Sequence, residues 1–114
     1  MDNIEAFNFK LDYIIGKFKQ DKNPEEALAF LYLKSYCKNK DEKKSLEIIK
    51  TSLINSEISQ HRIINNNIID IAANMVKERV DFYLNMTGGI DGFVQYISNP
   101  SNNINLVSGN MTQH

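Results

Sequence analysis

Hydrophobic positions recur at helical spacing along most of the chain. Apolar residues three or four positions apart mark one face between residues 3 and 19: Ile4, Phe7, Leu11, Ile14 or Ile15, and Phe18. The same spacing continues with Ala27, Leu28, Leu31 and Cys37, and then with Leu46, Ile49 and Leu53. Such periodicity is typical of amphipathic helices that bury one face. It predicts a first helix over 3–19, a second from Pro24 and a third that fades near Asn55.

Helix-start signals stand before these segments. Asp2 and Glu5 have the spacing of a capping box, in which each side chain accepts a hydrogen bond from a free backbone N–H. In Asn23-Pro24-Glu25-Glu26 an N-cap residue precedes a proline, which fits the first helical position, and two acids follow. Asp41 is the predicted cap of the third helix.

The longest helical pattern covers residues 57–86, which corresponds to about 45 Å if unbroken. It carries two apolar stripes about 100° apart. The first is Ile64, Ile68, Ile71, Met75 and Phe82, and the second is Ile69, Ala72, Ala73, Val76, Val80 and Tyr83. Asn55 or Ser56 is the expected cap. Asn65, Asn66 and Asn67 are weak helix formers, so a kink or break there is the alternative.

The stretch NMTGGIDGF, residues 85–93, follows this pattern and holds three of the five glycines. Phosphate-binding glycine loops follow a strand and lead into a helix, whereas these glycines follow a helix. Gly88 is therefore predicted to end the fourth helix in a left-handed conformation. Asp91 or Thr87 is then the expected cap of a short last helix. From Asn99 onward the composition is polar and predicts a flexible tail.

These elements together predict an all-α fold. No glycine lies between Gly16 and Gly88, and Pro24 is the sole proline there. A sheet would need tight turns rich in these residues. We expect a compact bundle of four main helices with a short fifth, formed by residues 1–98, and a tail over 99–114. The fourth helix is expected to be central or interfacial.

Composition and charge indicate the cellular compartment and the origin of the protein. In 114 residues the hydrophobic fraction is 42% and the formal net charge is −1. No apolar run approaches the ~20 residues that span a bilayer, and the single cysteine excludes an intrachain disulfide. We expect a cytoplasmic protein with no membrane contact. Asn, Ile and Lys supply 41 of the residues, a bias typical of AT-rich coding DNA, which suggests a phage or mobile element as one origin.

Candidate catalytic residues are sparse. Cys37 and His61 are the one possible thiol–imidazole pair, but Cys37 falls on an apolar helix face, where a structural cysteine is expected. Glu57 lies one turn before His61, yet helical carboxylate metal sites need Glu-x-x-His twice. The sequence therefore predicts no catalytic residue, no cofactor and no metal, and hence a protein that is not an enzyme.

Lysines cluster around the expected connection between the second and third helices. Lys34, Lys38, Lys40, Lys43 and Lys44 form a possible basic contact surface. Nucleic-acid binding through these lysines is the alternative function, although interleaved acids weaken phosphate attraction and a solvated, solubilising face is the favoured explanation of the lysines.

The remaining observations favour protein–protein binding by an inhibitor, immunity-type protein or regulator. Surplus apolar surface on the fourth helix usually marks an interface. We expect a partner or dimer interface at Ile69, Ala73, Val76, Val80 and Tyr83, used by a homodimer or by an unidentified protein. The competing interpretation is a central fourth helix whose apolar stripes both lie in the monomer core.

Overall fold

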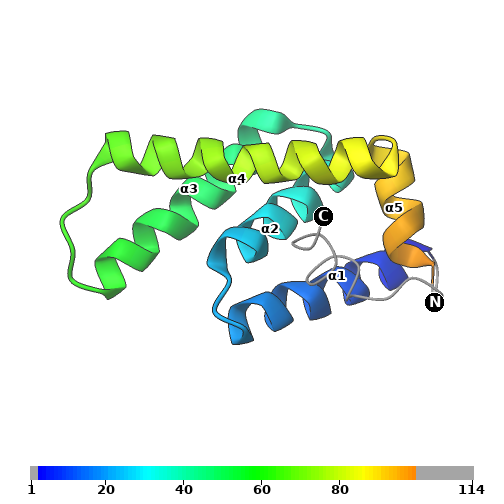
Figure 1. The fold of residues 1–114 in the computed structure, drawn as a ribbon, viewed down its shortest axis with the longest axis horizontal. Helices are drawn as coiled ribbons and strands as arrows, with labels where there is room; N and C mark the ends of the chain where they lie inside the picture. The colour runs from blue at the N-terminus through cyan, green and yellow to red at the C-terminus, as the bar shows by residue number, and fades with distance from the viewer. Residues whose placement is uncertain (1–2, 100–114) are drawn as a thin grey trace.

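The computed structural model describes residues 3–99, and in this range the chain forms five α-helices and no strand (Figure 1). The all-α prediction is confirmed. The helices are α1 (Asn3–Gln20), α2 (Pro24–Asn39), α3 (Glu42–Ser59), α4 (Asn66–Thr87) and α5 (Ile90–Ser98). None of these described helices is long and apolar enough to cross a bilayer. The capping box predicted for Asp2 and Glu5 and the tail predicted beyond Asn99 lie outside the described residues.

Two predicted helix starts are confirmed. Pro24 occupies the first turn of α2, although the Asn23 side chain makes no capping hydrogen bond. The Oδ1 atom of Asp41 accepts a hydrogen bond from the backbone N–H of Lys44 at 3.1 Å, which caps α3. This bond satisfies one of the amide groups that the first turn of a helix leaves free.

The prediction of one helix over 57–86 is wrong at its start. Helix α3 continues to Ser59, a loop covers residues 60–65, and α4 begins at Asn66. The Asn65 side chain accepts hydrogen bonds from the backbone N–H groups of Asn67 and Ile68, at 3.0 and 3.3 Å. The asparagine tract thus supplies the N-cap of α4, and the break that it suggested is present.

The end of α4 is confirmed at Gly88, which has a φ of 88° and donates its N–H to the Leu84 carbonyl at 3.0 Å. Only glycine takes this left-handed conformation without steric cost. The cap predicted for α5 is not formed, because α5 follows Gly89 with no side-chain capping bond. Thr87 instead donates its hydroxyl back to the Tyr83 carbonyl at 2.8 Å.

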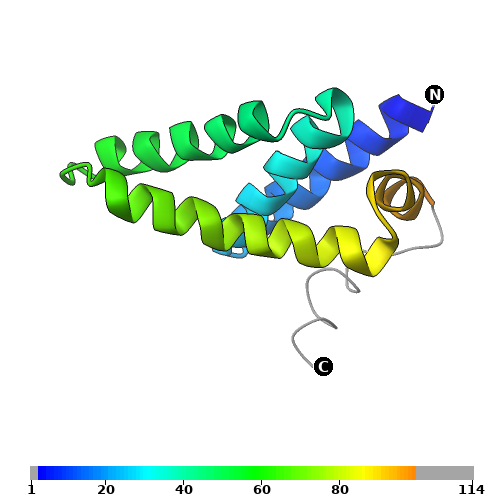
Figure 2. The ribbon, with the colours of Figure 1, turned by 90° about the horizontal axis from the view of Figure 1, so that it is seen from above.

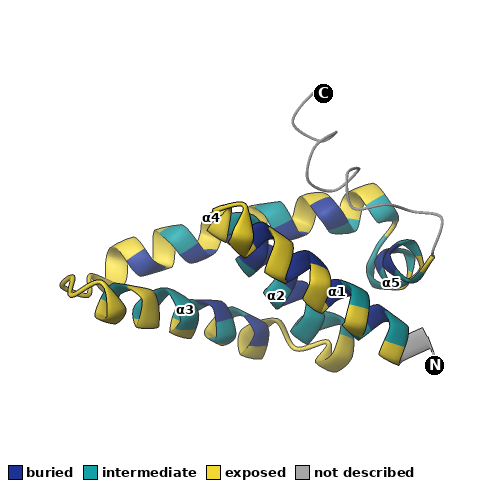
Figure 3. Cartoon of the chain, turned by 90° about the horizontal axis from the view of Figure 1, so that it is seen from below, coloured by how far each residue is buried: buried dark blue, intermediate teal, exposed yellow. Residues whose placement is uncertain are grey.

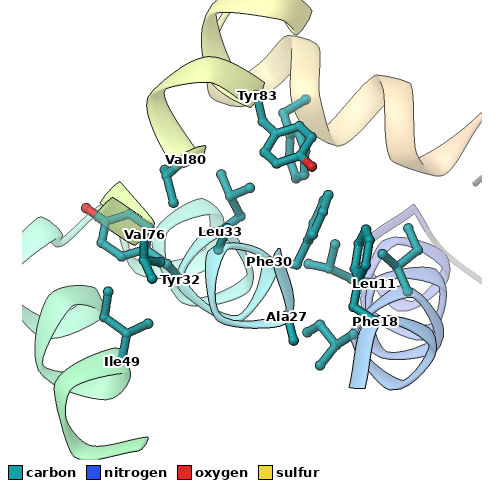
Figure 4. Packing of buried hydrophobic residues seen from close by; sticks show 14 of the residues in the cluster. Leu11, Phe18, Ala27, Phe30, Tyr32, Leu33, Ile49, Val76, Val80 and Tyr83 are labelled. Carbon is teal, nitrogen blue, oxygen red and sulfur yellow. The ribbon is translucent and has the colours of Figure 1, made fainter. Parts of the chain in front are cut away.

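The centre of the structure is α2, which packs against each of the other four helices. Helix α4, expected to be central or interfacial, contacts α2, α3 and α5. Figure 4 shows Tyr83 of α4 on the side of Phe30 of α2, Val80 on the side of Leu33, and Val76 near Tyr32. The main ring contacts of the core are Phe18–Phe30, Phe30–Tyr83, Phe30–Phe93 and Phe7–Phe93.

Helices α3 and α4 run in opposite directions, as the ion pairs Lys50–Asp70 and Lys77–Glu42 require. Their connecting loop extends away from α1 and α2 in both ribbon views, and α5 crosses the far end of α4 (Figures 1 and 2). The loop end of α4 therefore has fewer helices around it than the α5 end.

Candidate docking surface on α4

One apolar face of α4 belongs to the protein core. Its members are Ile69, Ala73, Val76, Val80 and Tyr83, each 5% exposed or less. These are the residues that we predicted to contact a partner. In the structure they are buried within the protomer, where α4 packs against α2, α3 and α5. These five side chains are therefore not at the surface of the protomer.

A second apolar face of α4 stays at the surface. We call it the exposed stripe: Ile64 in the preceding loop, then Ile68, Ile71, Met75, Phe82 and Met86. Their exposed fractions lie between 40% and 61%. At about 100° per residue the stripe is rotated by roughly 120° from the buried face. Figure 3 shows buried and exposed positions alternating along α4 for this reason.

A shallow apolar notch adjoins the exposed stripe. Two neighbouring cavities of about 180 and 290 Å³ share Pro24, Leu28 and Leu53 as lining residues. Met75 of the stripe lines the smaller cavity, and Ile15 of α1 lines the larger one. The apolar surface thus continues from α4 across the N-terminus of α2 to α1.

The loop end of the α3–α4 pair adds further apolar surface. Ile63 is 93% exposed and Ile58, in the last turn of α3, is 56% exposed. The free energy falls when an isoleucine side chain is removed from water. Keeping several of them exposed in one region therefore reduces the stability of the protein. Together with Ile64 and Ile68 they add apolar side chains to a loop end that also exposes His61 and Arg62.

The α5 end of the stripe is held by a polar network between α2 and α4. Arg79 Nε lies 2.7 Å from Glu26 Oε1, and the Tyr83 hydroxyl donates a hydrogen bond to the other Glu26 oxygen. Burial and then the bond to Glu26 raise the pKa of Tyr83 above its ordinary value. The Arg79 guanidinium lies 4.9 Å from the centroid of the Phe82 ring. A cation at this distance attracts the ring face, which orients Phe82 in the stripe.

The predicted basic surface is only partly assembled. Lys34 lies 2.6 Å from Asp12 of α1 and is neutralised by that ion pair. We call the other four residues, Lys38, Lys40, Lys43 and Lys44, the basic corner. They are exposed around the α2–α3 turn, and within residues 3–99 none has an acid at ion-pair distance.

Cys37 and His61 lie in different parts of the fold. Cys37 is half-buried beside Phe7 and Val94, and burial, with a smaller effect of Asp91, raises its pKa to about 11. His61 is exposed in the α3–α4 loop, and both carboxylate oxygens of Glu57 are taken by Arg62 at 2.7 Å. Across the described residues no group of three or more His, Cys, Asp or Glu side chains is placed to hold a metal ion.

Comparison with known proteins adds no assignment, since no family model, curated protein or solved structure matches this chain.

Proposed function

We propose that this chain acts by binding protein through the exposed stripe of α4. The observation that carries the proposal is one row of six large apolar side chains, each at least 40% exposed, of which five lie along the 22-residue helix α4 and Ile64 lies in the loop before it. An exposed apolar patch of several hundred Å² is uncommon on a monomer and is often functional.

The form of the surface favours a helical ligand. A partner helix laid along α4 would contact residues at three- and four-residue spacing, and the notch beside Met75 would receive a protruding side chain. This is the mode by which amphipathic helices dock into apolar grooves. The proposal is compatible with an inhibitor, an immunity-type protein or a regulator working in the cytoplasm, and it assigns the chain binding rather than catalysis.

The test places a photoreactive residue at Ile71 and, as a matched control, at Thr51. Both positions are exposed and helical, but Thr51 lies on α3, outside the stripe. Irradiation in the source cell is expected to give one discrete protein adduct from position 71 and none from position 51. Identical adduct patterns from both positions, or no adduct from either, would overturn the proposal.

A second candidate function rests on the basic corner. Four exposed lysines without an acid at ion-pair distance attract phosphate, and each phosphate contact that forms releases counterions. Binding to DNA or RNA would then weaken steeply as salt rises, and Lys43→Glu with Lys44→Glu would abolish it. Absence of any mobility shift at low salt excludes this function.

A further inference from the structure

We infer that the partner of the exposed stripe is a basic amphipathic helix, in which lysine or arginine side chains flank one apolar face. The inference rests on the proposed function and names the chemistry of the partner. Two observations carry it. Carboxylates without an ion-pair partner lie on both sides of the stripe, and the cations around α4 are already paired with acids.

The first carboxylate belongs to Glu78, in the middle of the stripe. Glu78 is exposed, and it lies three residues after Met75 and four residues before Phe82. At about 100° per residue, its side chain leaves α4 roughly 60° from that of Met75. No ion pair or hydrogen bond joins Glu78 to another described residue. A helix laid over Met75 and Phe82 would therefore bring one flank of its apolar face next to this carboxylate.

The stability of the protomer does not explain an acid at this position. The residues one helical turn away from Glu78 are Asn74, Met75, Asp81 and Phe82. None of them is a base that could pair with Glu78 along α4, and Asp81 adds a like charge, which disfavours the helix. Glu78 also interrupts a row of side chains that is otherwise apolar. The position thus suits contact with a base that the protomer itself does not supply.

The second carboxylate lies on the other side of Met75. Ala72 leaves α4 about 60° from Met75 in the opposite direction to Glu78, and it lines the smaller cavity of the notch. Glu25, in the first turn of α2, lines the same cavity of about 180 Å³, and within residues 3–99 it forms no ion pair. A lysine or arginine side chain fits this cavity, because its aliphatic stem can lie against Leu28 while its charged head reaches Glu25.

The cations near α4 do not offset these two acids. Both bases of α4, and the α3 base that pairs with it, already form ion pairs with N–O distances of 2.7–3.8 Å: Lys50–Asp70, Lys77–Asp81, Lys77–Glu42 and Arg79–Glu26. Helix α4 and its ion-pair partners together carry five acids and three bases, and Glu25 adds to the excess of acids. Lys19 lines only the larger cavity of the notch, toward α1. An acidic rim of this kind attracts a basic partner and repels an acidic one.

Two synthetic amphipathic peptides of about five helical turns test the inference. Both carry leucine at three- and four-residue spacing on one face, with lysine at the flanking positions in one peptide and glutamate in the other. Fluorescence anisotropy of the labelled peptides gives the dissociation constant of each. The wild-type chain is expected to bind the lysine peptide at least about tenfold more tightly, and added salt should reduce this ratio by screening the exposed charges. Equal binding of the two peptides, or no binding of either, would overturn the inference.

Charge reversal locates the contact. Glu78→Lys should weaken binding of the lysine peptide by about tenfold and strengthen binding of the glutamate peptide, because repulsion and attraction exchange places on one flank of the stripe. Glu47→Lys is the matched control, since Glu47 is also an exposed helical acid without an ion pair but lies on α3, outside the stripe. It should change both constants by less than about twofold. Equal effects of the two variants would mean that net charge, rather than the stripe, governs binding, and would contradict the inference.

The inference and the proposed function fail in different ways. If neither peptide binds but the photoreactive residue at position 71 captures a protein in the source cell, the docking function stands without the basic helix. An adduct at twice the mass of the chain identifies a second copy as the occupant, with the same consequence. If position 71 captures nothing, both are overturned. A captured segment with apolar residues at helical spacing, flanked by lysine or arginine, supports both.

Discussion

Gly92 is expected to be the least replaceable glycine, because α5 approaches the end of α4 most closely there. A Cβ atom added at Gly92 would lie 1.9 Å from the Thr87 carbonyl oxygen and 2.9 Å from its carbon. Ordinary carbon contacts lie at about 3.5–4.0 Å. In Gly92→Ala the two helices must therefore separate by on the order of 1 Å, and Phe93 and Ile97, both 1% exposed, move with α5.

The cost follows from this displacement. Overpacking of a core region costs about 1–3 kcal/mol. At about 4–8 °C per kcal/mol for a small domain, Gly92→Ala should lower Tm by about 5–20 °C. Gly88→Val should cost about 1–2 kcal/mol for a different reason, since a side chain is strained at a φ of 88°.

Gly16→Ala is the matched control. A Cβ at Gly16 meets no atom within 4 Å, and the residue lies within α1. Alanine there should raise stability by about 0.5–1 kcal/mol through its higher helix propensity. Thermal unfolding followed by circular dichroism compares the three variants. A Tm for Gly92→Ala equal to or above that of the wild type would refute the close approach of α5 to Thr87.

Three further predictions concern single side chains. Tyr83→Phe should destabilise the fold by about 1.5–3 kcal/mol, because it removes a hydrogen bond to the Glu26 carboxylate. Tyr32→Phe should be neutral or stabilising, since the buried Tyr32 hydroxyl has no hydrogen-bond partner among the described residues. Equal chemical-denaturation midpoints for the two variants would contradict this prediction. Lys40→Gly should raise Tm, because Lys40 ends α2 in the left-handed conformation with a φ of 55°, which costs a non-glycine residue about 1–2 kcal/mol; a lower Tm would show that the lysine side chain itself stabilises the turn. The Cys37 thiol should react slowly with iodoacetamide at pH 8–9 and quickly in denaturant, because its folded pKa of about 11 lies above the unfolded value of about 8.5; equal rates would mean that the thiol is not desolvated.

The helix class and most helix ends were predictable because their causes are local. Pro24, Asp41 and Gly88 act on backbone groups within four residues of themselves. The turns after α1, α2 and α3 carried no such signal. Lys22, Lys40 and His61 take the left-handed conformation there; lysine does not favour it, and histidine is enriched in it but does not by itself predict a turn. The apolar residues on either side of Asn65 keep the same helical spacing. The sequence pattern therefore did not show that a new helix begins after Asn65.

The choice between the two stripes of α4 could not be made from sequence, because both repeat at helical spacing. The buried stripe carries the smaller side chains, Ala73, Val76 and Val80, while Ile71 and Met75 remain outside. Small residues let α4 approach α2, and this gain in close packing depends on the shape of α2 rather than on the hydrophobicity of α4. The residues predicted to contact a partner are therefore buried, roughly 120° around α4 from the exposed stripe.

The distinction between the core face of α4 and its proposed docking face is tested most directly by placing the same charge on each. Thermal unfolding of Val80→Glu and Ile71→Glu, followed by far-UV circular dichroism at micromolar concentration, makes the comparison. Val80 is fully buried and Ile71 is 60% exposed. The account predicts that Val80→Glu loses the cooperative transition, because an unpaired charge enters the core, and that Ile71→Glu keeps the helical signal and transition of the wild-type monomer. A folded Val80→Glu beside an unfolded Ile71→Glu would contradict it.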